Sequence, residues 1–334
     1  MSAGDQQRLA VIGGGSWGTA LAVVLGARRP VRLWVREPEI AAAITGRREN
    51  PVFLSGVTIP ASVTCSTDLA ATVAEAQIVL TVMPSHVCRP VMTALRPHLP
   101  PDAIVVSATK GLEDATLCRM SEVIEAVLGS GTHLGVLSGP SFAREVARGD
   151  PTALVVAARD PDVAQLLQRE LAGPTLRLYS SQDVAGVELA AALKNVIAIA
   201  AGICDGLGLG SNSVAALISR GLAEMTRLVC ACGGRPETLA GLAGLGDLVL
   251  TCTGGLSRNR SVGSALGQGR KLPEILGEMK MVAEGVKTTS AAVALARRHG
   301  VEMPIVAQMQ RVLFEGVDPR AALRELMERT LRSE

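Results

Sequence analysis

Short apolar runs alternate with helix-like segments through the first half of the chain. The runs have the length and composition of β-strands and cover residues 8–12, 31–35, 77–82, 103–107, 133–138, 153–157 and 175–179. Segments with helical spacing separate many of them, at 16–28, 86–96, 116–128 and 162–171. Strands that alternate with helices in this way predict a mostly parallel sheet with helices on both faces.

The second half of the chain has a different pattern. After about residue 182 the short apolar runs give way to longer segments with helical spacing. Asp183 is placed to cap a helix that runs to about Asp205. Further helical runs lie near 211–232, 261–268, 288–299, 305–315 and 319–331. We therefore predict an α/β domain over residues 1–182 and an all-helical domain over 183–334, with a substrate cleft at their junction.

The first predicted strand runs into a glycine-rich turn and then a helix. Gly13, Gly15 and Gly18 have the order G-x-G-x-x-G. Gly13 permits a tight turn, Gly15 lets the backbone approach a pyrophosphate, and Gly18 lets the helix pack on the strand. The helix N-terminus adds N–H groups and a positive dipole end. This context predicts a Rossmann-type dinucleotide-binding domain, and the alternative is a glycine-rich turn without a ligand.

The end of the second predicted strand bears on which dinucleotide binds. An acidic residue roughly 20 positions after the glycines would accept from the ribose 2′-OH of NAD. This chain has Arg36 there, followed by Glu37. A guanidinium suits a 2′-phosphate and has no acceptor for a 2′-OH. We therefore expect NADP(H) to be preferred or shared with NAD(H), unless Arg36 is only a solvated residue at a strand end.

Composition and charge narrow the classes of partner. The chain has 334 residues, is 48% hydrophobic and has a net charge of +2. No basic tract for nucleic acid is present. Aromatic residues make up only 2% of the chain, so few rings are available to stack on bases and the core must be built from Ala, Val and Leu in closely packed helices. We expect a small-molecule substrate and no nucleic-acid partner.

Cysteines, histidines and the most apolar segment predict a reduced cytosolic protein without a metal. The seven cysteines include no C-x-x-C pair, and the four histidines have no ligand spacing. No signal peptide is recognisable at the N-terminus. The apolar stretch 184–204 contains Glu188 and Lys194, which favours a buried helix over a membrane span.

Lys194 is the first candidate for chemistry. At helical spacing it shares one face with Ala198, Ala201 and Asp205, so that face is open enough to lie against a ligand. Desolvation in so apolar a helix should lower the pKa of this lysine, which suits a proton donor near neutral pH. The alternative is a structural lysine that reaches the surface or pairs with Glu188.

Four further candidates lie in polar segments. Lys110 follows a predicted strand and could reach a cofactor or an anionic substrate, or lie at the surface of a turn. Asp247 follows a glycine-rich segment and could orient Lys194, bind a substrate hydroxyl or cap the next helix. The loop containing Arg258 and Asn259 could bind phosphate or be a solvated turn. Glu284 could accept from a nucleotide or cap a helix.

Several motifs together resemble one family, the bacterial-type NAD(P)-dependent glycerol-3-phosphate dehydrogenases. The similar segments are Gly13-Gly-Gly-Ser-Trp-Gly18, Pro84-Ser-His86, Ala108-Thr-Lys-Gly-Leu-Glu113, Ser138-Gly-Pro-Ser141, Leu193-Lys-Asn195, Gly221-Leu-Ala-Glu224, Ala243-Gly-Leu-Gly-Asp247, Ser257-Arg-Asn259 and Ala283-Glu-Gly285. They occur in the family order over residues 8 to about 314. Such an ordered set is far more specific than the glycine pattern alone.

The resemblance implies reversible reduction of dihydroxyacetone phosphate to sn-glycerol 3-phosphate, which supplies phospholipid biosynthesis. It makes Lys194 the catalytic acid/base at the substrate C2 oxygen. It places Lys110, Gly139, Ser141, Lys194, Asp247, Ser257, Arg258 and Asn259 around the substrate. It places Gly13, Gly15, Ser16, Trp17, Gly18, Arg36, Lys110, Ala143, Arg258, Val282 and Glu284 along the nucleotide. Ser141 stands where the family often has Thr, which keeps the hydroxyl.

Two alternatives remain open on the sequence. One is another two-domain NAD(P) dehydrogenase, acting on a β-hydroxyacid or ketopantoate, which would also use a lysine. The other is a non-catalytic NAD(P)-binding regulator, which the presence of Lys194, Lys110 and Asp247 disfavours. A cytoplasmic homodimer is expected.

Overall fold

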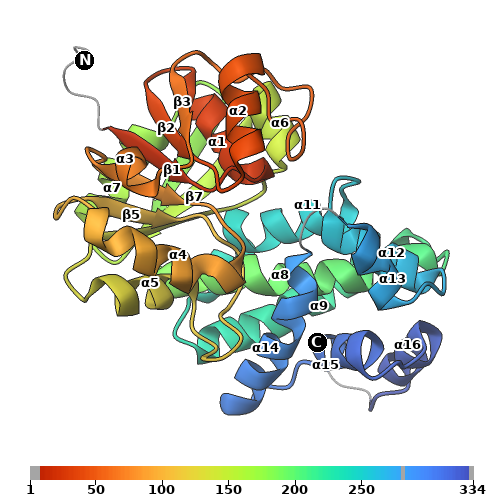
Figure 1. Cartoon of the computed structure of the whole chain (residues 1–334). Helices are drawn as coiled ribbons and strands as arrows, with labels where there is room; N and C mark the ends of the chain where they lie inside the picture. The colour runs from red at the N-terminus through yellow and green to blue at the C-terminus, as the bar shows by residue number, and fades with distance from the viewer. Residues whose placement is uncertain (1–7, 280–282, 331–334) are drawn as a thin grey trace. The chain divides into compact units, whose positions relative to one another are not determined.

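The chain forms two compact units in a computed structural model that describes residues 8–279 and 283–330 (Figure 1). Unit 1 comprises Met1–Glu113 and Cys118–Glu188, and unit 2 comprises Asp114–Leu117 and Leu189–Glu334. The division therefore lies close to the predicted domain boundary at 182/183. Where the functional domains divide stays a prediction.

Unit 1 is built on one sheet with the strand order β3-β2-β1-β4-β5-β6-β7-β8. The strands are β1 Leu9–Ile12, β2 Val31–Trp34, β3 Val63–Ser66, β4 Ile78–Thr81, β5 Ile104–Ser107, β6 Leu134–Ser138, β7 Thr152–Ala158 and β8 Leu176–Ser181. Neighbouring strands are parallel except β6 and β7, which are antiparallel. The prediction of a mostly parallel sheet is confirmed, and the carboxyl ends of β1, β4, β5 and β6 lie at one edge.

The hydrophobic pattern missed β3. This strand, Val63-Thr-Cys-Ser, pairs only with β2 at the edge of the sheet. Val63 is buried, whereas the other three residues keep some exposure. An edge strand with one buried face position has too few apolar residues to stand out in the sequence.

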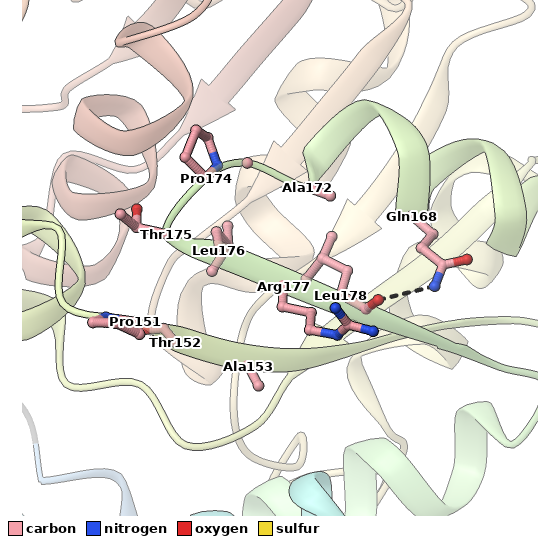
Figure 2. Close-up of a pocket in the computed structure, with 11 residues that line it drawn as sticks. Pro151, Thr152, Ala153, Gln168, Ala172, Pro174, Thr175, Leu176, Arg177 and Leu178 are labelled. Atoms are coloured by element: carbon pink, nitrogen blue, oxygen red, sulfur yellow. Dashed lines mark hydrogen bonds between the residues drawn. The ribbon is translucent and has the colours of Figure 1, made fainter.

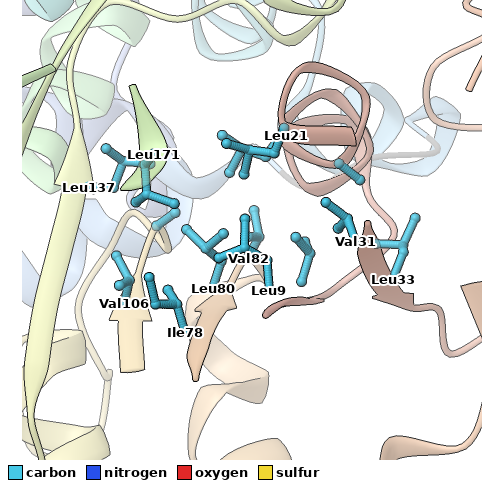
Figure 3. Close-up of a cluster of buried hydrophobic side chains, with 14 of the residues drawn as sticks. Leu9, Leu21, Val31, Leu33, Ile78, Leu80, Val82, Val106, Leu137 and Leu171 are labelled. Atoms are coloured by element: carbon cyan, nitrogen blue, oxygen red, sulfur yellow. The ribbon is translucent and has the colours of Figure 1, made fainter. Parts of the chain in front are cut away.

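Helices cover both faces of the sheet, as predicted (Figure 1). They are α1 Ser16–Gly26, α2 Pro38–Arg47, α3 Leu69–Val73, α4 Cys88–Leu95, α5 Met120–Leu128, α6 Ala143–Arg148 and α7 Pro161–Leu171, with short 3₁₀ turns at Ser85–Val87 and Arg96–His98. Successive strand residues point to opposite faces. Leu9 and Val11 therefore join the apolar cluster that contains Leu21 of α1 (Figure 3), whereas Ala10 and Ile12 join the cluster under α4 and α5.

Unit 2 is all-helical over its described residues, which confirms the predicted class. Its helices are α8 Val184–Gly206, whose first turns belong to unit 1, α9 Ser211–Ala231, α10 Pro236–Ala240, α11 Asp247–Thr253, α12 Arg258–Gly267, α13 Leu272–Glu278, α14 Glu284–Arg298, α15 Pro304–Phe314 and α16 Pro319–Met327, with a π-helical turn at Leu242–Gly246. The N–H of Gly186 donates to Oδ1 of Asp183 at 2.8 Å, so Asp183 caps α8 as predicted.

Glycines let α8 and α12 approach one another closely. A Cβ on Gly202 would lie 2.0 Å from the carbonyl oxygen of Arg260, and a Cβ on Gly263 would lie 1.9 Å from that of Ile199. Such backbone contact requires a residue without a side chain at both positions. The scarcity of aromatic residues is thus matched by close helix packing in unit 2.

The most apolar helix is buried. By length and composition α8 could cross a membrane, and among the described residues it is the helix that meets both conditions. Its most apolar window is 100% buried within the structure, as in the core helix of a globular protein.

Candidate active site

The glycine turn joins β1 to α1, and two of its glycines are required by the turn itself. Gly13 has a φ of 125°, and a Cβ there would lie 2.1 Å from the carbonyl oxygen of Val82. A Cβ on Gly18 would lie 1.9 Å from the carbonyl oxygen of Gly13. A side chain at either position would force backbone segments apart, whatever the turn binds.

Gly15 is different, because no contact among the described residues explains its lack of a side chain. Its φ of −69° and ψ of −178° suit any residue, and a Cβ there would meet no described atom within 4 Å. The open backbone lies at the N-terminus of α1, where a pyrophosphate could approach. Nearby, the indole Nε1 of Trp17 is a buried donor without an acceptor among the described residues. The residues of this turn therefore fit a dinucleotide.

Arg36 follows β2, and its side chain is 75% exposed. Its Nε and Nη2 both donate to Oε1 of Glu37, at 3.0 and 2.6 Å. An exposed pair of this kind contributes little to stability, so either partner can turn to a ligand at small cost. A 2′-phosphate would attract Arg36, and a ribose hydroxyl could donate to Glu37. The predicted use of both nucleotides is compatible with this geometry.

Three predicted substrate residues of unit 1 meet at one carbonyl group. Nζ of Lys110 donates to the carbonyl oxygen of Gly139 at 3.4 Å, and Oγ of Ser141 donates to the same oxygen at 3.0 Å. Lys110 follows β5, and Gly139 and Ser141 follow β6, so parallel strands bring them to the same edge of the sheet. Gly139 has a φ of 139°, a conformation that favours glycine. Ala143 begins α6, which packs against α1.

Unit 2 contains a buried ion pair between Lys194 of α8 and Asp247 of α11. Nζ of Lys194 lies 2.7 Å from Oδ1 of Asp247 and donates to Oγ1 of Thr251 at 2.7 Å. The side chains of Lys194 and Asp247 are only 6% and 2% exposed. The oxygen Oγ1 of Thr251 also donates to the carbonyl oxygen of Asp247 at 2.6 Å. Three polar groups on two helices are thus held in one arrangement.

This pair excludes some of the alternatives that the sequence left open, and the catalytic role of Lys194 stays a prediction. Lys194 is neither at the surface nor paired with Glu188, because Glu188 instead accepts from Arg119 at 3.1 Å and from Ser121. Asp247 does not cap α11, which has Gly246 at its N-cap position and no side-chain cap. Thr251 was not among the predicted site residues, although it lies four residues after Asp247 and so on the same helical face.

A second polar chain links α8, α12 and α14. Nδ2 of Asn259 donates to Oδ1 of Asn195 at 3.0 Å, and the N–H of Gly285 donates to Oδ1 of Asn259 at 3.0 Å. Asn259 is 8% exposed and Asn195 is 4% exposed. Asn195 follows Lys194 directly in the sequence, so this chain fixes the helix that carries the lysine. Asn195 belongs to one of the family-like motifs but was not among the predicted site residues.

Ser257 caps α12, since its Oγ accepts from the N–H of Arg260 at 3.2 Å. Arg258 keeps exposed surface at the first position of that helix. Desolvation lowers the pKa of the Arg258 guanidinium, and the nearby Glu284 carboxylate partly offsets this by raising the same pKa. Glu284 begins α14, whose N-cap residue is Ala283, so Glu284 is not the cap. The predicted nucleotide residue Val282 lies outside the described residues.

The predicted site residues therefore fall into one group in each unit. The group in unit 1 contains Gly13, Gly15, Ser16, Trp17, Gly18, Arg36, Lys110, Gly139, Ser141 and Ala143. The group in unit 2 contains Lys194, Asp247, Ser257, Arg258, Asn259 and Glu284.

A cavity of about 610 Å³ lies elsewhere in unit 1 (Figure 2). It is lined by β7, β8 and the end of α7, where Nε2 of Gln168 donates to the carbonyl oxygen of Leu178 at 2.9 Å. None of the predicted site residues lines this cavity, and the cavity does not by itself favour another location for the site.

Two family models match most of the chain. The model of the NAD-dependent glycerol-3-phosphate dehydrogenase N-terminus matches residues 8–164, and that of the C-terminus matches residues 183–324. Together they span both groups of site residues.

Individual relatives and solved structures support the same family. A glycerol-3-phosphate dehydrogenase [NAD(P)+] of Koribacter versatilis is 59% identical over 332 residues, which is 98% of each chain. The crystal structure of a glycerol-3-phosphate dehydrogenase from Coxiella burnetii is 42% identical, covers 97% of this chain and 99% of its own, and has a TM-score of 0.93. A ketopantoate reductase from Ralstonia eutropha is 16% identical, covers 96% of this chain and 100% of its own, and has a TM-score of 0.62, which shows a shared fold alone.

Proposed function

Because the chain belongs to the NAD-dependent glycerol-3-phosphate dehydrogenase family, we propose that it catalyses the reversible reduction of dihydroxyacetone phosphate to sn-glycerol 3-phosphate. It is an NAD(P)-dependent oxidoreductase. The observation that carries the proposal is the buried pair of Lys194 and Asp247, with Thr251 against the same ammonium.

Lys194 is the proposed proton donor to the C2 oxygen. As the carbonyl carbon is reduced, negative charge develops on that oxygen, and an ammonium held in place both stabilises the charge and delivers the proton. Asp247 and Thr251 fix the position of Nζ at 2.7 Å each, so little reorganisation is needed during the reaction. In the reverse direction the same nitrogen takes the proton of the hydroxyl.

The glycine turn, Trp17 and Arg36 would hold the nucleotide. Bound NADPH or NADH supplies the hydride for the carbonyl carbon. The open backbone at Gly15 would accept the pyrophosphate at the helix N-terminus, and Ser16, Trp17 and Ala143 would line it. Glu284, and Val282 by the family resemblance, would contact the nucleotide from the helical part of the chain.

Arg258 and Asn259 are the proposed phosphate contacts, with Ser257, Lys110, Gly139 and Ser141 around the rest of the substrate. A guanidinium at the first position of a helix combines a planar donor with the N-terminal dipole, which suits a phosphate. Since Asn259 is fixed by Asn195 and Gly285, the start of α12 is held in one position. We further propose a cytoplasmic homodimer that serves phospholipid biosynthesis.

Replacing Lys194 tests the function directly. We expect Lys194→Ala to lower kcat by about 10³-fold, because the proton donor is lost, while NADPH binding persists. The oxidation of NADPH and NADH by dihydroxyacetone phosphate, followed at 340 nm, measures kcat. Titration calorimetry measures NADPH binding. Lys271→Ala, which changes an exposed lysine of unit 2, is the matched control and should behave as the parent.

Two results would count against the proposal. If the parent oxidises neither nucleotide with dihydroxyacetone phosphate, the assigned reaction is wrong. If Lys194→Ala keeps near-parental turnover, the reaction stands and the role of Lys194 is wrong.

A further inference from the structure

Asn50 lies beneath the glycine turn, although no sequence motif pointed to it. It is 0% exposed and lies two residues after Arg48, the left-handed C-cap residue of α2. Its Nδ2 donates to the carbonyl oxygen of Gly14 at 2.8 Å and to Oγ1 of Thr19 at 2.9 Å. Oγ1 of Thr19 donates in turn to the carbonyl oxygen of Gly14 at 3.2 Å. One carbonyl group of the turn thus receives hydrogen bonds from two buried side chains.

The segment Asn50–Leu54, which we call the strap, is tied to the same turn by further contacts. The N–H of Phe53 donates to Oδ1 of Asn50 at 3.1 Å, and the N–H of Leu54 donates to the carbonyl oxygen of Asn50 at 3.1 Å. Oγ of Ser16 donates to the carbonyl oxygen of Phe53 at 2.6 Å. The amide of Asn50 therefore bonds through both its ends, one to the turn and one to the strap.

We propose that Asn50 is a positioning residue for the coenzyme, which acts by fixing the peptide unit between Gly14 and Gly15. In a trans peptide the C=O and the N–H point in opposite directions. Holding the Gly14 carbonyl toward Asn50 therefore directs the Gly15 N–H away from the core, at the N-terminal end of α1. This inference rests on the proposed function, because it assigns that N–H to the pyrophosphate of NAD(P)H.

Both hydrogen bonds of the Asn50 nitrogen end in the glycine turn and the first turn of α1, whereas its oxygen accepts from the strap. Gly15, the residue whose N–H is oriented, is also the glycine of this turn at which a Cβ would meet no described atom within 4 Å. The buried amide and the open backbone therefore meet at the same peptide unit.

Asn50→Asp is the first test, because it keeps the shape and removes the two N–H donors. We measure binding of NADPH, NADH and adenosine 2′-monophosphate to the full chain by calorimetry. The first two contain a pyrophosphate and the third does not. We expect the affinity for both dinucleotides to fall by about 10- to 100-fold, as for a misplaced binding group. The affinity for the monophosphate should fall by less than about 2-fold. At saturating nucleotide, kcat should stay within a few-fold of the parent.

Glu170→Gln is the matched control. Glu170 is buried in unit 1 and pairs with Arg29 at 2.7 Å, so its loss weakens the same unit without touching the turn. Dinucleotide affinity that falls equally in Glu170→Gln and Asn50→Asp would overturn the proposal, as would parental affinity in Asn50→Asp. An equal loss for the monophosphate would also overturn it.

A milder variant covers the case in which Asn50→Asp does not fold. Thr19→Val removes one hydroxyl that bonds both Asn50 and Gly14. We expect the affinity for the dinucleotides to fall by roughly 3- to 10-fold. Parental binding in Thr19→Val would then reject the role of the network. Because binding is measured without substrate, a parent that binds NADPH but does not reduce dihydroxyacetone phosphate refutes the reaction and leaves the role of Asn50 intact.

Discussion

The two groups of site residues are built from different parts of the polypeptide. In unit 1 the turn at Gly13–Gly18 and the carbonyl of Gly139 present backbone groups, and a few side chains adjust them. In unit 2 the site consists of side chains from separate helices, with Lys194 and Asp247 buried against each other. A backbone site depends on glycines and helix termini, whereas a side-chain site depends on the packing of distant segments.

The two kinds of site are sensitive to different substitutions. A backbone site is lost when a new Cβ occupies the space of another backbone segment or of the ligand. A buried side-chain site is lost when a substitution removes one partner and leaves the other charged and unpaired. Substitutions in the two groups should therefore differ in whether they affect stability, catalysis or nucleotide binding.

Removing the counter-charge of Lys194 should have a large effect, close to that of removing Lys194 itself. We expect Asp247→Asn to lower kcat by about 10²- to 10³-fold, since Lys194 loses the group that positions it. The unpaired buried ammonium should also cost about 3 kcal/mol of unfolding free energy. Steady-state kinetics measure kcat, and urea unfolding measures the free energy of unfolding. Asp205→Asn, an exposed carboxylate of α8 that pairs with Arg260 at 3.0 Å, is the control. Equal effects in both variants would refute the assigned role.

Two glycines of one turn should respond differently. Gly13→Ala should lower the unfolding free energy by on the order of 3 kcal/mol, because its Cβ would lie 2.1 Å from a carbonyl oxygen at a φ of 125°. Gly15→Ala should leave thermal stability unchanged and weaken NADPH binding by about 10-fold or more. Melting curves and calorimetry separate the two effects. A strongly destabilised Gly15→Ala protein would mean that packing, and not the ligand, requires that glycine.

The buried carboxylate of Glu224 should affect stability without affecting catalysis. It accepts from the N–H groups of Ile305 and Val306, and burial raises its pKa to about 7 from an ordinary 4.5. The folded state therefore binds more protons than the unfolded state between pH 4.5 and 7, so stability falls as pH rises through that window.

Glu224→Gln should remove this dependence. Relative to the variant, the free energy of unfolding of the parent should fall by about 2–3 kcal/mol between pH 4.5 and 7.5. Urea unfolding at each pH measures this difference. The turnover of the variant should match the parent, in contrast to Asp247→Asn. A parallel pH dependence in both proteins would show that other groups are responsible.

Exposed Arg36 should have the smallest effect, confined to the choice of nucleotide. Arg36→Ala should lower kcat/KM for NADPH by about 10-fold, since one exposed charge contact with the 2′-phosphate is lost. The value for NADH should change little. Arg32→Ala is the control, because Arg32 lies within β2, has a side chain that is 41% exposed and pairs with Glu75 at 2.7 Å. An unchanged NADPH-to-NADH ratio would place the 2′-phosphate elsewhere.

Most of the fold was predictable because hydrophobic periodicity reports local burial. Seven of the strands, the helical second half and the cap at Asp183 were predicted and are present. The edge strand β3 was not, because three of its four residues keep some exposure. Site residues were predicted in two ways. The glycine turn, Arg36 and the candidates for chemistry were singled out from local patterns; these candidates are Lys110, Lys194, Asp247, Arg258, Asn259 and Glu284. The roles of Ser16, Trp17, Gly139, Ser141, Ala143, Ser257 and Val282 depended on the family resemblance.

The α/β class, the helical second half and the glycine turn could be predicted from the sequence, since each depends on neighbours a few positions apart. The tertiary structure was needed to show that Lys194 pairs with Asp247 and not with Glu188, that Thr251 joins them, and that Asn50 lies under the turn. These contacts join residues dozens of positions apart. Local periodicity carries no information about which buried polar groups meet, because that depends on how whole helices and loops pack.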